Sequence, residues 1–154
     1  MTPDAPNQSQ ALEPPANPAG AFVPEPGAAL PRREQLIAEI TAAPRAVRAA
    51  VRGLTATQLE AKYRNWTVRQ IVHHIADSHL NAFIRFRLAL TEDRPTIKPY
   101  DEGRWVRLAD SRSGEIESSL SVLDGLHARW VEMLRGMTDQ DFARRYFHPE
   151  TQSE

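Results

Sequence analysis

A transition metal in this chain would have to be held by histidine and carboxylate side chains, because the sequence contains no cysteine. Thiolate zinc sites, cysteine nucleophiles and disulfides are excluded for the same reason. Three of the five histidines crowd into the run His73-His74-Ile-Ala-Asp-Ser-His79. Two imidazoles on one helix share a metal when they lie about four residues apart. The separations here are one, five and six residues, so this run cannot clamp a metal with two of its own histidines.

A polar stripe accompanies these histidines on the helix that we expect around them. His74, Ser78, Asn81 and Arg85 follow one another at spacings of four, three and four residues, with Asp77 alongside. One interpretation is the wall of an internal cavity, in which His74 is a metal ligand and its neighbours support it or contact a substrate. The other is a solvent-facing polar edge, and spacing alone favours this second interpretation.

The other histidines of the helices have structural interpretations. His79 and His127 fall on apolar stripes, and buried polar groups in such places are normally hydrogen-bonded core residues. His73 points nearly opposite to the apolar stripe of its own helix, so we expect it at the surface.

Apolar periodicity predicts an all-α fold with three long helices. They begin near Arg32, run from Val68 to about Thr91, and begin again near Ile116. Pro44 lies inside the first, where a kink or break near Ala43 is expected. Up-and-down bundles of this kind usually contain four helices. No strand-like alternation is found.

Capping boxes and the positions of prolines and glycines predict the remaining elements. Thr55 with Gln58 and Thr67 with Gln70 are capping boxes; the first predicts a short helix ending near Lys62 and the second opens the middle long helix. Thr138 and Asp141 indicate another capped turn. Residues 92–114 hold prolines and glycines and are expected to form a long structured loop, a type of segment that is often functional.

Composition divides the chain into a tail and one domain. Residues 1–31 hold eight of the twelve prolines and only three charges, which predicts a disordered tail followed by a helical domain over residues 32–154.

The net charge of −1 gives no reason to expect nucleic acid or an anionic membrane as a partner. No apolar run approaches the roughly 20 residues of a membrane span, and no secretory signal is recognisable. We expect a cytoplasmic location.

Several continuous segments resemble one known family. They are Tyr63–His79 (YRNWTVRQIVHHIADSH), Asn81–Glu92, Pro95–Glu102, Leu126–Trp130 and Phe147–Glu150. Together they closely resemble the YfiT-type branch of the DinB-like superfamily, over roughly residues 33–150. The run from Trp66 to Glu102 is the most specific part of the match.

The resemblance implies a fold, a cofactor and an activity. Members have four-helix bundles, often form homodimers, and bind one divalent metal, zinc or nickel, through three histidines. They are described as metal-dependent hydrolases, and the YfiT branch is linked to transfer of bacillithiol-type low-molecular-weight thiols to small electrophilic substrates. The first family ligand maps onto His74, which overturns the preference for a surface role. The surrounding pocket residues would then be Asp77, Ser78, Asn81, Arg85 and His127.

The sequence departs from the family at its C-terminal end. The other two family ligands come from an HxxxH motif on a fourth helix, and this sequence has no HxxxH. We therefore expect a C-terminally incomplete bundle with an incomplete metal site. Two hypotheses stay open: a metal-dependent hydrolase or thiol transferase in which His74 is the remaining ligand, and a catalytically silent helical fragment that acts only by associating with itself or a partner.

Overall fold

The computed structural model describes residues 13–14 and 30–150, and every structural statement below refers to this part of the chain. Most of the tail predicted over residues 1–31 lies outside these residues. Within it, the backbone carbonyl of Glu13 accepts a hydrogen bond of 2.9 Å from the Asn65 side chain. No helix of the described part is long and apolar enough to cross a membrane.

Three long helices form the body of the molecule, and their predicted positions are confirmed. They are α1 (Leu30–Val51), α3 (Val68–Thr91) and α6 (Ile116–Gly136). α6 lies between the other two, because its main helix contacts are with α1 and α3. The predicted all-α bundle is therefore confirmed.

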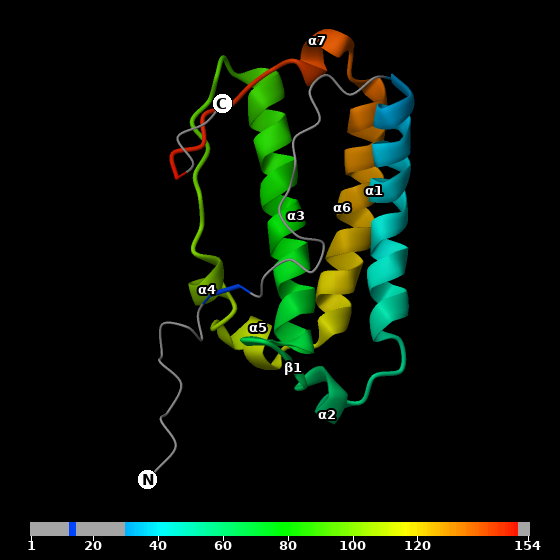
Figure 1. Ribbon diagram of the computed structural model, residues 1–154, viewed down its shortest axis with the longest axis vertical. Helices are drawn as coiled ribbons and strands as arrows, with labels where there is room; N and C mark the ends of the chain where they lie inside the picture. The colour runs from blue at the N-terminus through cyan, green and yellow to red at the C-terminus, as the bar shows by residue number, and fades with distance from the viewer. Residues whose placement is uncertain (1–12, 15–29, 151–154) are drawn as a thin grey trace.

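The directions of the helices differ from simple up-and-down alternation. α1 runs opposite to α6, whereas α3 and α6 run the same way (Figure 1). Two hydrogen bonds fix this arrangement: His73, near the start of α3, bonds to Ser119, near the start of α6, and Arg144, beyond α6, bonds to Ala89, near the end of α3. Parallel neighbours need a long return connection, and residues 92–115 supply it along the outside of α3 (Figure 1).

A break near Ala43, one of the two outcomes expected from Pro44, does not occur, since α1 continues to Val51. Proline has no N–H, so the carbonyl of Ile40, four residues earlier, loses its normal helical donor. That carbonyl instead accepts a hydrogen bond from the His127 ring, 2.7 Å away. A side chain of α6 thus replaces the missing backbone bond, and the helix passes through Pro44 without interruption.

A small hairpin between α1 and α3 was missed from the sequence. The capping box of Thr55 is present, but α2 (Ala56–Leu59) ends before Lys62. β1 (Lys62–Tyr63) then pairs antiparallel with β2 (Trp66–Thr67), and Arg64 in the turn has a φ of 55°. Two-residue strands are too short to show alternation, so only the turn could have revealed them.

The connection after α3 is ordered by two short helices, α4 (Glu102–Trp105) and α5 (Ala109–Ser113). Side chains at the start of α3 bind it: Gln70 donates to the carbonyl of Val106 at 2.9 Å, and Arg69 donates to that of Gly114 at 2.7 Å. Arg69, only 8% exposed, also pairs with Glu60. The prediction of a structured loop is therefore confirmed.

The C-terminal part closes the opposite end of the bundle. α7 (Asp139–Phe142) begins with the predicted capping box of Thr138 and Asp141. Beyond it, Phe147 exchanges backbone hydrogen bonds with Pro95 and Ile97, at 2.9 and 3.1 Å.

The apolar core is centred on α6 and aromatic residues of α3. Trp130 stacks edge-on against Phe86, with ring centroids 5.5 Å apart, and contacts Phe83 in the same way at 6.2 Å. Further buried positions on α6 follow the helical period: Leu120, Leu123, Leu126, Val131 and Leu134.

Adjacent residues of α6 give a matched test of this core. Leu123 is 1% exposed and Val122 is 46% exposed. Leu123→Ala should lower the free energy of unfolding by about 2–5 kcal/mol, because it removes buried contacts and leaves a cavity. Val122→Ala should change it by no more than about 0.5 kcal/mol. Urea denaturation of both variants checks the difference, and equal losses would contradict this packing.

Candidate functional site

His74 lies in the N-terminal half of α3 and is partly buried. Its ring meets the fully buried Trp66 edge-on, with centroids 4.9 Å apart. Burial lowers the pKa of His74, and the negative charge of Glu102 offsets this only in part. The imidazole is therefore neutral near pH 7, the form that can bind a metal. A ring in bulk solvent, as the polar-edge interpretation requires, is not what is found.

The polar residues that follow His74 on α3 are partly buried as well: Asp77, Ser78, Asn81 and Arg85. Burial is the main cause that raises the pKa of Asp77, and repulsion from Asp110 adds to it. Asn81 donates to the backbone carbonyl of Asp77 at 2.9 Å, so part of its amide is used within α3. These side chains form a partly desolvated polar wall next to His74.

Tyr100 belongs to this wall and was missed in the sequence. Burial and the nearby carboxylate of Glu102 raise the pKa of Tyr100 to about 12, while Ser78 acts in the opposite direction. Its ring packs against Trp105 at 4.5 Å. The phenol therefore keeps its proton at neutral pH and is a hydrogen-bond donor. Its place in the long loop, between Pro99 and Asp101, was the available signal.

The prediction that His73 lies at the surface is wrong. Its ring is 5% exposed, with Nδ1 2.8 Å from the hydroxyl of Ser119 and Nε2 3.4 Å from the carbonyl of Gly114. The connection that returns to α6 covers this side of α3, so a residue opposite the main apolar stripe is still buried. A helical wheel of one helix cannot reveal a second covering element.

His79 and His127 form a hydrogen-bonded pair across α3 and α6, as the core-histidine interpretation predicted. His79 Nδ1 lies 2.7 Å from His127 Nε2, and His127 is 3% exposed. Burial is the main cause that lowers the pKa of His79 to about 4, with smaller electrostatic contributions from His127 and His74. His74 lies five residues before His79 on α3, about 7.5 Å along the helix axis.

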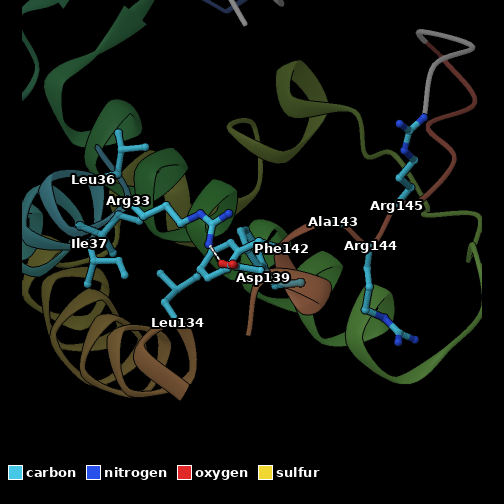
Figure 2. Close-up of a pocket in the computed structure, with 11 residues that line it drawn as sticks. Arg33, Leu36, Ile37, Leu134, Asp139, Phe142, Ala143, Arg144 and Arg145 are labelled. Carbon is cyan, nitrogen blue, oxygen red and sulfur yellow. Dashed lines mark hydrogen bonds and ion pairs between the residues drawn. The ribbon is translucent and has the colours of Figure 1, made fainter. Parts of the chain in front are cut away.

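A separate groove of about 690 Å³ lies between α1 and α6, near α7. Its floor is apolar, with Ile37, Phe86 and Leu134 among its residues, and Figure 2 shows the side chains of Arg33 and Asp139 meeting at its edge. Phe86 follows His74 by twelve residues on α3, about 18 Å along the helix. The groove is thus distinct from the polar wall.

The described side chains match the expected metal site only in part. Within residues 13–14 and 30–150, no three His, Asp or Glu side chains are close enough together to hold a metal ion. His74 is neutral and is the predicted ligand, but the described residues do not complete a coordination shell around it. We therefore derive no chemical step through a metal.

Comparisons with known proteins identify the family to which the chain belongs. The model of the DinB superfamily matches residues 39–154. The "Putative metal-dependent hydrolase YfiT" of Bacillus subtilis is 43% identical over 136 residues, which are 87% of this chain and 76% of that protein. A protein named in the same way from Geobacillus thermodenitrificans is 51% identical over 113 residues, 72% of this chain and 64% of the relative.

A solved structure supports the same similarity. It is described as YfiT from Bacillus subtilis, a probable metal-dependent hydrolase with an unusual four-helix bundle topology. The TM-score is 0.86 at 43% identity, and the match covers 88% of this chain and 79% of that one. The parallel α3 and α6 described above belong to this shared topology.

The depressed pKa of His79 predicts how stability depends on pH. Below about pH 6.5 the unfolded chain binds a proton that folded His79 does not bind until about pH 4. This contribution to the free energy of unfolding is therefore present above pH 6.5 and is lost as the pH falls to about 4. The amount by which the urea midpoint of the wild type exceeds that of His79→Gln should therefore decrease as the pH falls from 6.5 to about 4. A difference that stays constant with pH would contradict the assignment.

Proposed function

Because the chain belongs to the DinB superfamily, we propose that it is a cytoplasmic metal-dependent hydrolase in which His74 is one ligand of a divalent metal, zinc or nickel. The observation that carries this proposal is the setting of His74. Its imidazole is partly buried, kept neutral by desolvation, and held against Trp66. Two relatives that are 43% and 44% identical to this chain carry the name "Putative metal-dependent hydrolase".

The polar wall is consistent with a substrate site beside that ligand. Tyr100 supplies a phenol that stays protonated, and Asp77 and Arg85 supply a carboxylate and a guanidinium. A hydrolase needs groups that orient a carbonyl or leaving group and that exchange protons with it. We propose that Tyr100 donates to the substrate oxygen and that Arg85 orients an anionic part of the substrate.

Metal uptake tests the central assignment. His74→Ala should weaken binding of Zn²⁺ or Ni²⁺ at least about tenfold, because loss of a ligand costs no less than loss of an outer-shell partner. Calorimetric titration together with elemental analysis of the purified protein measures this. His73→Gln is the matched control, since the adjacent ring is bound to Ser119. Equal metal affinity in His74→Ala and wild type would refute the proposal.

A finer proposal concerns the reaction. We propose that a low-molecular-weight thiol of the bacillithiol type serves as the nucleophile toward a small electrophile. The sulfur bonds to the electrophilic carbon, the leaving group departs with its electron pair, and the thiol proton passes to solvent. Mass spectrometry of protein, thiol and an alkyl halide should find the thioether faster than in a His74→Ala reaction. Ester hydrolysis without thioether formation would favour the hydrolase alone.

We also propose that the protein is a homodimer. Exposed apolar side chains on α3, Leu80 at 40% and Ile84 at 46% exposure, lie one turn apart and offer a self-complementary strip. Light scattering should give twice the 17.3 kDa mass of the chain, and Ile84→Lys should give the monomer mass. A monomeric wild type would contradict this assembly.

A further inference from the structure

A chain of hydrogen bonds crosses all three long helices and has a definite direction. It begins at the carbonyl of Ile40 on α1, passes through the ring of His127 on α6, and reaches His79 on α3, with both donor–acceptor distances at 2.7 Å. A carbonyl oxygen can only accept. His127 must therefore carry its proton on Nδ1, and its Nε2, when neutral, can only accept.

The hydrogen bond between the two rings then fixes which nitrogen of His79 carries the proton. Since His127 Nε2 accepts, His79 must donate from Nδ1, and the lone pair of neutral His79 is on Nε2. Among the described residues, no donor forms a hydrogen bond with that nitrogen, whereas both nitrogens of His127 are used. The chain thus fixes one tautomer of His79 and leaves its second nitrogen open as an acceptor.

Pro44 explains why the carbonyl of Ile40 is available. In an uninterrupted helix, that carbonyl would accept from the N–H of residue 44, which proline lacks. Pro44 is buried in α1, and its ring tends to push the carbonyl four residues earlier away from the helix axis. A proline inside a long helix is costly, and here the cost is offset by the bond to His127.

We infer that His79 is a fixed hydrogen-bond acceptor of the His74 site, with His127 and Pro44 as the residues that position it. The ligand it would take is a small proton donor: water, an alcohol or a thiol. The assignment of His79 to the His74 site rests on the proposed function, whereas the assignment of the His79 tautomer does not. His79 follows His74 by five residues on α3, about 7.5 Å along the helix axis.

The low pKa of His79 suits this role. A ring with a pKa of about 4 stays neutral throughout the physiological range, so Nε2 remains an acceptor and does not become a competing donor. Hydrogen bonding of the opposite ring nitrogen to a fixed partner is also the usual means by which proteins orient a functional imidazole.

The tautomers can be observed directly by NMR of the full chain with ¹⁵N-labelled histidine. At pH 7, His79 and His127 should each show a protonated Nδ1 and an unprotonated Nε2. A proton on Nε2 of His79 would overturn the inference. The signals of His73, whose ring is bound to Ser119 and buried, serve in every sample as an internal check that the fold is intact.

Paired substitutions test the positioning residues. In His127→Leu, His79 loses its acceptor and should shift toward a mixture that includes the Nε2–H form. In His127→Gln, the side-chain amide oxygen can still accept, so the Nδ1–H form should persist. In Pro44→Ala, the new N–H competes for the Ile40 carbonyl, and the Nδ1–H signal of His127 should weaken. Unchanged tautomers in His127→Leu or in Pro44→Ala would refute the role of that residue.

The availability of Nε2 has a separate chemical readout. Diethyl pyrocarbonate acylates an unprotonated imidazole nitrogen, and at pH 5.5 ordinary histidines are mostly protonated. His79 should therefore be modified at this pH, as peptide mass spectrometry would show, while His73 should not. An unreactive His79 would overturn its role as an open acceptor. Neither measurement needs metal or substrate, so both remain decisive if the hydrolase proposal fails.

Discussion

The bond between the Ile40 carbonyl and the His127 ring is the constraint on which the arrangement of the helices depends. It satisfies a backbone group that Pro44 leaves without a helical donor, and it fixes the proton of a buried ring. A buried polar group without a partner costs about 1–3 kcal/mol. Because the His127 ring also accepts a hydrogen bond from His79, it holds both α1 and α3 in register with α6. Apolar packing alone would tolerate small sliding of these helices, but a directional 2.7 Å bond on each side does not.

The parallel course of α3 and α6 has a consequence for the site. The return connection must pass along α3, and Arg69, Gln70 and His73 hold it there through bonds to its backbone or to the start of α6. This connection brings Tyr100 and Glu102 to the side of α3 that carries His74, where the carboxylate of Glu102 helps to raise the pKa of Tyr100 and partly offsets the lowering of the pKa of His74. The polar wall therefore results from the topology: an up-and-down hairpin would have left that side of α3 in solvent.

The sequence was sufficient for the three long helices and for the capping boxes, because periodicity and capping boxes are local signals, but it did not reveal the short β1–β2 hairpin. All three long helices and the capping boxes of Thr55, Thr67 and Thr138 are found where they were expected. The errors concern relations between elements. The burial of His73, the direction of α6 and the place of Tyr100 all depend on the return connection, whose path no local pattern encodes. His74 was assigned as a metal ligand only by family resemblance, since its spacing alone favours a solvent-facing edge.

α3 unites two different environments along its length. Its N-terminal half carries His74 and Asp77 in a desolvated polar setting, while its C-terminal half contributes Phe83 and Phe86 to the apolar cluster around Trp130. His79 stands at the boundary, with a ring near Trp130 on one side and His127 as its hydrogen-bond partner. Core packing therefore helps to position the His79 ring, which lies next to the apolar cluster. A substitution in the Trp130 cluster can therefore move the ring of His79, whereas changes in the return connection can reshape the wall around His74 and leave the core intact.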